Sequence, residues 1–492
     1  MAVSNTGPVH RTALPRSVLS AAVAAGFMSL FGTYWDDAWH TDRGRDSAWI
    51  APHLALYGSV GIVGVIVVGW GIVALRGGSI RTLLRERPLL TAGAGGAATL
   101  AAAPIDAAWH AAFGRDAVLW SPPHLFAVAG SITLIVGLVS SMAGKRSLLL
   151  GSAIVALLLG ALLVPVLEYE TGVPQFAEVW YLPVLLVGSL TAAALGRTAF
   201  PGRRVVAPAV LIYVVVRLID MAVLGWLGFS TPDLPLAVVG LAVVDLPWRT
   251  ALARYAGAAI SISALAWLVA GAGLAGQAEG EIATTATAII TVAAVAVLAG
   301  SYGRGRLMPL GTVLLATSLI VISPVRSAMA HDPGQGEIVA SVHLTVSSGG
   351  AHRLTVSADL RSGCDADPVE VVARRAGVEV RAGLADRGDC RFGVSVTVPG
   401  DGRWFVYVDF RIGGRAVEGW LPIESDRRAT ITADRALYIP AGSPGVSAGE
   451  LAAGATLYGA VILLLAVGVR TVRRERPDCR SSGPEQQDQV DQ

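Results

Sequence analysis

The segment SLLLGSAIVALLLGALLVPVL, residues 147–167, contains no charged side chain. About 20 mostly apolar residues are enough for a helix to cross the hydrocarbon core of a bilayer. Charged residues make up only 15% of the 492-residue chain, whereas a typical soluble domain has about 25%. The sequence therefore predicts a mainly α-helical polytopic membrane protein and argues against a soluble enzyme.

Similar apolar stretches recur along the chain and predict a bundle of about twelve transmembrane helices. Eleven precede residue 330 and one lies near the end, and the eighth is the shortest. They lie at residues 17–39, 50–75, 89–110, 121–142, 147–167, 180–200, 206–228, 234–247, 251–274, 282–302, 307–328 and 450–469.

The basic residues indicate an orientation, because short cytoplasmic loops of membrane proteins collect Lys and Arg. If the N-terminus is cytoplasmic, the short outer loops receive only Arg43, Arg45 and Arg115. We therefore expect a multi-pass plasma-membrane protein with the lipid bilayer as its partner. The net charge of +2 gives no electrostatic reason to expect nucleic-acid binding.

Residues 331–445 have a different pattern, in which apolar and polar residues alternate as in half-buried strands. Examples are the runs 338–346, 391–398 and 404–410, separated by glycine-rich turns. We expect an extracytoplasmic β-sandwich, in which Cys364 and Cys390 could form a disulfide. The predicted divisions of the chain are a membrane domain at 1–330, this β-domain at 331–445, a transmembrane helix at 446–470 and a disordered cytoplasmic tail at 471–492.

An internal repeat carries the most informative polar residues. Residues 34–58 read YWDDAWHTDRGRDSAWIAPHLALYG, and residues 103–130 read APIDAAWHAAFGRDAVLWSPPHLFAVAG. Each copy joins two predicted spans, so the motif occurs in two helical hairpins, 17–75 and 89–142. The matching residues are Asp36, Trp39, His40, Gly44, Arg45, Asp46, Pro52 and His53 in the first copy and Asp106, Trp109, His110, Gly114, Arg115, Asp116, Pro123 and His124 in the second.

In each copy the first Asp and the first His are four residues apart, so they share one helix face. The second His begins the next span, and the loop returns it toward that face. Two imidazoles and a carboxylate form a three-ligand site with open coordination positions, suited to copper, zinc or non-haem iron. The alternative is a set of interfacial polar residues at helix ends. The predicted ligands are Asp36, His40 and His53, and Asp106, His110 and His124, with the pairs Arg45–Asp46 and Arg115–Asp116 as hydrogen-bonding support.

The pattern D-x3-H-x12/13-H resembles the metal-binding motif of the C subunit of particulate methane monooxygenase and ammonia monooxygenase, which are membrane copper proteins. The resemblance covers about 25 residues in each copy. It implies that the Asp and the two His of each copy bind copper. The chain departs from that family in its length and in the doubling of the motif.

Other charged residues of the membrane domain are predicted to be buried. Arg217 and Asp220, three residues apart, are most simply an ion pair, with a proton or ion path as the alternative. Asp245 lies in the eighth predicted span. Glu168 and Glu170 could either line the same outer region as the repeat or lie at the surface.

The β-domain contains a possible second metal site at His331, His343 and His352. The sequence before His331 is similar to a signal-peptidase site, and cleavage there would expose an amino-terminal histidine. The domain loosely resembles small periplasmic copper-binding β-domains. Without cleavage, His331 would simply begin a linker.

These observations favour two functions. The first is a copper membrane monooxygenase-like oxidase of small apolar substrates. The second is copper transport or periplasmic copper delivery without turnover. For either function, the expected partners are other membrane subunits or a periplasmic copper chaperone. A scaffold role without metal is a third alternative.

Overall fold

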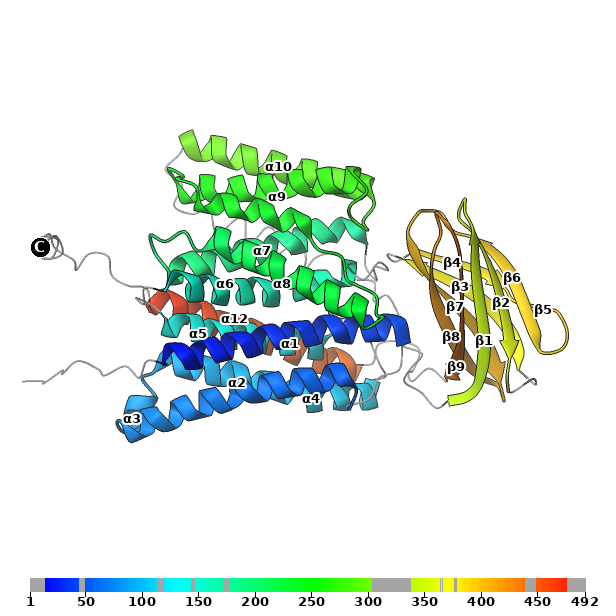
Figure 1. The fold of residues 1–492 in the computed structure, drawn as a ribbon, viewed down its shortest axis with the longest axis horizontal. Helices are drawn as coiled ribbons and strands as arrows, with labels where there is room; N and C mark the ends of the chain where they lie inside the picture. The colour runs from blue at the N-terminus through cyan, green and yellow to red at the C-terminus, as the bar shows by residue number, and fades with distance from the viewer. Residues whose placement is uncertain are drawn as a thin grey trace, which may run out of the picture.

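The structure of the protein is a computed structural model, which describes residues 14–43, 49–113, 119–142, 147–170, 177–302, 338–362, 364, 366–375, 378–438 and 448–475. A bundle of long helices has a β-domain at one end (Figure 1). The helices are α1 (Arg16–Arg43), α2 (Ala51–Arg76), α3 (Ile80–Leu83), α4 (Arg87–Phe113), α5 (Pro122–Ser141), α6 (Leu148–Leu163), η1 (Val164–Tyr169), η2 (Glu178–Trp180), α7 (Tyr181–Ala199), α8 (Val206–Trp226), η3 (Leu236–Asp245), α9 (Ala251–Gly271), α10 (Glu279–Tyr302) and α12 (Ala448–Arg474).

Within the described residues, ten helical segments are long and apolar enough to cross a membrane. The protein is therefore a membrane protein by helix length and composition. Of the twelve predicted spans, the one at 307–328 lies outside the described residues. The one at 234–247 is η3, a 3₁₀ helix of 10 residues. At about 2 Å per residue it is only about 20 Å long, because Pro235 and Pro247 flank it and proline interrupts helical hydrogen bonding.

Small residues bring α4 and α5 into close contact. A Cβ added to Gly95 would lie 2.3 Å from the backbone nitrogen of Leu134, and one added to Gly137 would lie 2.4 Å from the nitrogen of Ala92. Close backbone approach at glycine is typical of helix packing in membranes. The last helix, α12, packs on this pair, and the Thr91 and Thr471 hydroxyls hydrogen-bond at 2.8 Å.

The described residues of the β-domain form nine antiparallel strands, and the three predicted runs correspond to β1, β6 and β7. The β7–β8 turn contains Gly413 and Gly414, both with positive φ (57° and 77°), as tight hairpin turns require. The strands are β1 (Ile338–Gly349), β2 (Arg353–Leu360), β3 (Asp367–Arg375), β4 (Val378–Gly383), β5 (Ala385–Asp386), β6 (Arg391–Thr397), β7 (Arg403–Ile412), β8 (Arg415–Glu424) and β9 (Arg428–Tyr438).

The strand order is β4-β3-β7-β8-β9-β1-β2-β6-β5, but only one residue pair, Glu418 and Tyr438, joins β8 to β9. The sheet therefore folds into two layers, as a β-sandwich does, and the apolar core lies between them. Alternate residues of β1 are buried, because successive side chains point to opposite faces of a strand. The structure also contains the Cys364–Cys390 disulfide that the sequence suggested.

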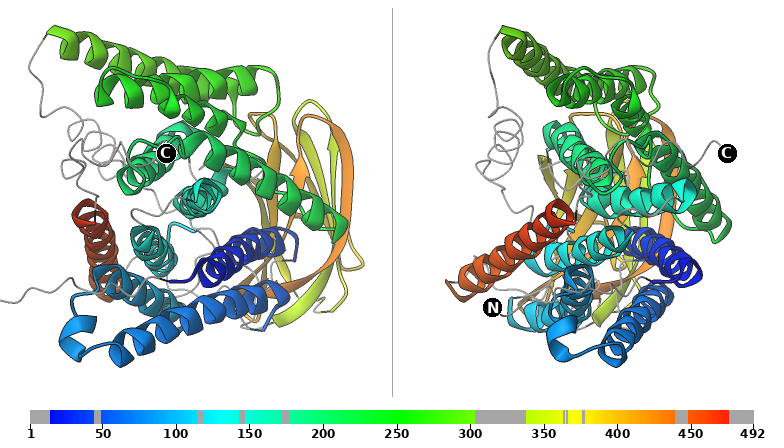
Figure 2. Two further views of the ribbon diagram at one scale, coloured as in Figure 1. Left: turned by 60° about the vertical axis from the view of Figure 1, so that its left-hand side comes forward. Right: turned by 90° about the vertical axis from the view of Figure 1, so that its left-hand side faces the viewer.

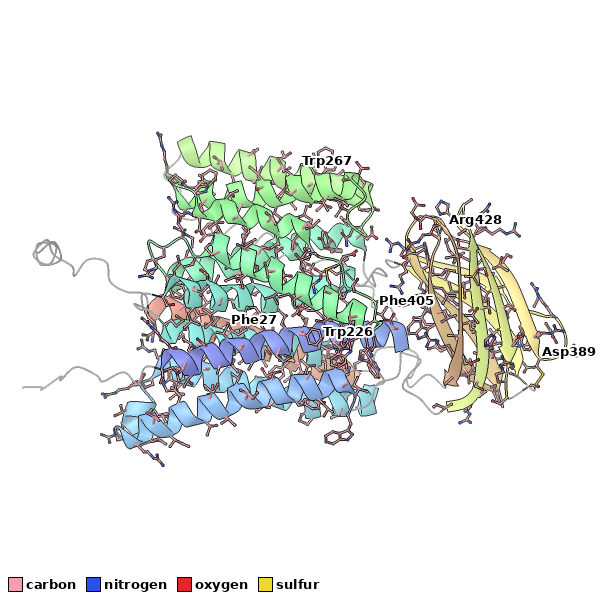
Figure 3. The ribbon with its side chains drawn as sticks, viewed as in Figure 1. Phe27, Trp226, Trp267, Asp389, Phe405 and Arg428 are labelled. Carbon is pink, nitrogen blue, oxygen red and sulfur yellow. A yellow bond between two sulfur atoms is a disulfide. The ribbon has the colours of Figure 1, made fainter. Side chains whose placement is uncertain are left out.

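The β-domain contacts the bundle end where α1 finishes and α2 begins. The two further views show α9 and α10 at the side of the bundle away from α1 and α2 (Figure 2). Phe405 lies on the bundle-facing side of the β-domain (Figure 3), in a cluster with Val372, Tyr407 and Trp420. The end of α1 and the start of α2 therefore lie at the bundle end that faces the β-domain.

Candidate metal centre

Proline sets the start of the second helix in each repeat hairpin. Helix α2 has a proline at its first or second position, after Ile50 in an extended conformation (ψ 155°). Proline suits this position because its fixed φ is helical and the first N–H groups of a helix have no intrahelical partner. This start places His53 in the first turn of α2, where it faces the end of α1.

Asp36, His40 and His53 converge as the sequence predicted. One ligand atom from each lies within 4.8 Å of the others. His53 Nε2 is 3.1 Å from Asp36 Oδ1, and His40 Nε2 is 3.8 Å from Asp36 Oδ2. The three side chains are between 16% and 25% exposed, so the group is partly buried at the end of the bundle.

These distances fit a single small metal ion. Nitrogen and oxygen ligands lie about 2.1 Å from such an ion, so neighbouring ligand atoms of a tetrahedral site are about 3.4 Å apart. The two separations involve different oxygens of Asp36, 3.1 Å from Oδ1 to His53 and 3.8 Å from Oδ2 to His40, and they lie on either side of this value. Since the protein supplies three donors, at least one coordination position would remain open to water or substrate.

Asp36, and not the adjacent Asp37, joins the two histidines. In the second copy of the repeat, Ala107 occupies the position of Asp37. Aromatic rings lie nearby, with His53 and Tyr57 at a centroid distance of 5.8 Å. Trp39 stacks on Phe229 at 5.6 Å. The carboxylate and imidazoles thus lie beside apolar rings at the helix end.

The second hairpin repeats part of this arrangement. Helix α5 also has a proline at its first or second position, and His124 Nε2 lies 3.4 Å from Asp106 Oδ1. The main chain of His110 belongs to α4, whereas its side chain lies outside the described residues. The four supporting residues predicted in the two loops, Arg45, Asp46, Arg115 and Asp116, also lie outside them.

Glu168 lies beside the second hairpin and is buried, with 5% of its surface exposed. Its carboxylate accepts a hydrogen bond from the backbone N–H of Leu119. The indole Nε1 of Trp120 donates to the carbonyl of Pro165 at 2.9 Å. Of the two alternatives for Glu168, the surface position is therefore wrong, and the residue lies beside the second copy of the repeat, where η1 contacts Leu119 and Trp120.

The predicted Arg217–Asp220 ion pair is wrong. Within the described residues, the carboxylate at ion-pair distance from Arg217 is Glu170, with 2.8 Å between Nη2 and Oε2. The guanidinium also lies 3.7 Å from the centre of the Tyr34 ring. Asp220 is buried on the same helix, and Arg217 extends to a residue 47 positions earlier, which local spacing cannot reveal.

Asp245 holds a helix end in place. Its Oδ2 accepts hydrogen bonds from the backbone N–H groups of Val206 and Ala207, at 2.8 Å and 2.9 Å. Its Oδ1 accepts one from Arg197 at 2.9 Å. A carboxylate at the N-terminus of a helix satisfies unpaired donors and interacts favourably with the helix dipole, so Asp245 stabilises the start of α8.

The two β-domain histidines that the structure describes, His343 and His352, lie apart. His343 Nδ1 contacts Asp434 Oδ1 at 2.7 Å, and this hydrogen bond lowers the pKa of Asp434. His352 lies in the β1–β2 turn, 3.5 Å from Asp401. Six residues of β1 follow His343 before the turn that contains His352, and they separate the two histidines by about 20 Å. His331 lies outside the described residues.

Sequence reasoning missed the residues that attach the β-domain to the bundle. Arg375 forms a buried ion pair with Glu178 at 2.6 Å, and Arg435 Nη2 donates to the carbonyl of Asp42 at 3.0 Å. Arginines on strands are common, and nothing in the local pattern marks these two. Only the packing of the domains identifies them.

No family model matches the chain, and no curated protein or solved structure is significantly similar to it.

Proposed function

We propose that the protein is an integral membrane copper protein that binds one ion at Asp36, His40 and His53. The convergence of these three side chains within 4.8 Å carries the proposal. The second hairpin would hold another ion at Asp106 and His124 together with His110. The Asp106–His124 contact supports the same role for the second copy.

Copper is the metal that the donor set favours. Imidazole nitrogen suits copper, zinc and iron, and among divalent first-row metals copper binds most tightly to a given nitrogen and oxygen site. The resemblance of the motif to that of the copper membrane monooxygenases points to the same metal. Zinc and non-haem iron are the alternatives, and metal analysis of the purified protein distinguishes them.

The proposed reaction is oxidation of a small apolar substrate by dioxygen. Bound copper would supply the redox chemistry, while the aromatic and apolar side chains near the ligands would admit an apolar molecule from the bilayer. Trp35, Trp39 and Phe229 form one such surface, with Trp35 and Phe229 rings 6.3 Å apart. The open position on a three-ligand site makes the chemistry possible.

The proposed orientation places the metal centre and the β-domain outside the cytoplasm. The arginines at the other ends of the hairpins support it, for example Arg76 at the end of α2 and Arg81 and Arg85 after it, because cytoplasmic loops are basic. The disulfide in the β-domain supports it too, because disulfides persist in oxidising compartments.

Metal content and turnover test the two parts of the proposal separately. Wild-type protein, His40→Ala and His110→Ala are purified in detergent, and bound metals are measured by plasma mass spectrometry. We expect copper in the wild type and less in each variant. The loaded protein is then given alkanes, alkenes or ammonia with oxygen and a reductant.

Each result has a distinct meaning. Equal copper in all three proteins would refute the assignment of the site. Stoichiometric copper without oxygen-dependent turnover would refute the oxidase and favour copper transport or delivery, which predicts altered copper tolerance when the gene is deleted.

A further inference from the structure

The last turn of α1 is attached directly to the β-domain. Arg435 of β9 donates from Nη2 to the carbonyl oxygen of Asp42 at 3.0 Å. This carbonyl is one of the last four of α1, and the last four carbonyl groups of a helix accept no hydrogen bond from within the helix. A cation at this position also interacts favourably with the helix dipole. His40 lies two residues earlier, in the same final turn.

The side chain of Asp42 is held as well. Ser230 donates to its carboxylate from both the backbone nitrogen and the hydroxyl, each at 2.5 Å. Arg403 of β7 donates from Nη1 and Nη2 to the Ser230 hydroxyl oxygen at 3.3 Å. Its Nη2 is also 4.0 Å from Asp42 Oδ1. We call these four residues, Asp42, Ser230, Arg403 and Arg435, the Asp42 contact.

Arg435 is itself held in a fixed direction. Its Nε donates to the carbonyl of Trp420 at 3.2 Å, and its guanidinium lies 5.5 Å from the centre of the Trp420 ring. The planar guanidinium can therefore hold the strand and the helix end at the same time. The β-domain thus supplies a rigid support for the end of α1.

A metal ligand needs such support, because ion binding requires donors within a few tenths of an ångström of their positions. The Asp36, His40 and His53 side chains are not in tight contact, so their positions depend on such support. His40 Nε2 is 3.8 Å from Asp36, and His53 Nε2 is 3.1 Å from Asp36. Any movement of the last turn of α1 moves His40 relative to His53, which belongs to α2.

We propose that Arg403 and Arg435 are positioning residues for His40, so that docking of the β-domain sets the geometry of the metal centre. The inference rests on the proposed metal site at Asp36, His40 and His53. Neither arginine touches the ion in this scheme, and both act through Asp42. Removing residues that orient metal ligands usually weakens metal affinity by about 10- to 100-fold.

The test measures copper affinity and the electron paramagnetic resonance spectrum of Cu(II) in the full-length protein. We expect Arg435→Ala and Ser230→Ala to weaken copper binding about 10-fold or more and to change the spectrum. Ser230→Ala lies outside the β-domain fold, so it tests the contact even if Arg435→Ala fails to fold. Arg435→Lys keeps one donor and should restore part of the affinity.

Glu178→Gln is the matched control. It weakens the other attachment of the β-domain, the 2.6 Å ion pair with Arg375, without touching Asp42. We expect its copper affinity and spectrum to match the wild type. Equal losses in Glu178→Gln and Arg435→Ala would mean that any loosening of the domain has this effect, and would overturn the inference.

Wild-type affinity in both Arg435→Ala and Ser230→Ala would also overturn it. These failures differ from failure of the proposed function, which would appear as absence of copper from the wild-type protein. A wild type that binds copper in a manner independent of His40 would refute both.

Discussion

Replacing His53 by alanine should remove most of the copper affinity of the first hairpin. His53 makes the shortest contact of the group, 3.1 Å from Asp36, and its loss leaves only Asp36 and His40 as donors. Loss of a residue that merely orients a ligand costs about 10- to 100-fold in affinity. We therefore expect loss of a ligand to cost at least about 100-fold.

The same change has a calculable effect on stability. Copper at 100 times its Kd stabilises the folded protein by about 2.7 kcal/mol. After a 100-fold loss of affinity, the same concentration equals the new Kd and contributes only about 0.4 kcal/mol. The copper-dependent part of the free energy of unfolding should therefore fall by about 2.3 kcal/mol.

The assay is copper titration against a competing chelator, together with thermal unfolding with and without copper. His343→Ala is the control, because this histidine contacts Asp434 on the β-domain and lies apart from the Asp36 group. If His53→Ala keeps the wild-type copper affinity and the wild-type stabilisation by copper, the reasoning about the site is refuted.

Three further predictions concern stability. Glu170→Gln should destabilise the protein by about 3–5 kcal/mol, because the fully buried Arg217 would lose its carboxylate partner; unchanged unfolding in denaturing detergent would contradict this. Gly95→Ala should destabilise the bundle by about 1–3 kcal/mol, because the added Cβ would lie 2.3 Å from a backbone nitrogen of α5. Gly93→Ala is the control, since a Cβ at position 93 has no atom within 4 Å, and it should be neutral in the same measurement. Burial raises the pKa of Asp409 from 3.8 to about 6, so the folded state binds this proton more tightly than the unfolded state, and stability should fall as pH rises from about 4 to about 6. Asp409→Asn should flatten that dependence and add about 3 kcal/mol at pH 7, and a pH profile of thermal unfolding identical to the wild type would argue against it.

The convergence of Asp36, His40 and His53 could be predicted from the sequence because the information for it is local and occurs twice. A four-residue spacing puts Asp36 and His40 on one helix face, and Pro52 fixes where the next helix begins, so a short loop must bring His53 back. The two copies of the motif also distinguish Asp36 from Asp37, because Asp36 matches Asp106 whereas Asp37 matches Ala107.

The partners of single buried charges could not be predicted in this way. Local spacing pairs Arg217 with Asp220, but its carboxylate partner is Glu170, which directly follows η1. Asp42 and Arg435 are 393 residues apart in sequence. A long guanidinium side chain can reach several elements, so its partner depends on which helix or strand packs beside it.

By itself, the sequence determined that this is a membrane protein of long apolar helices with a strand-rich domain near its end, because hydropathy and periodicity act within a single element. It also determined the three side chains that converge at the turn of the first hairpin. Only the tertiary structure decided that the short eighth segment is η3, that Glu170 is the partner of Arg217, and that the β-domain contacts the end of α1. These features depend on contacts between segments distant in sequence, and such contacts form only when whole elements pack against one another.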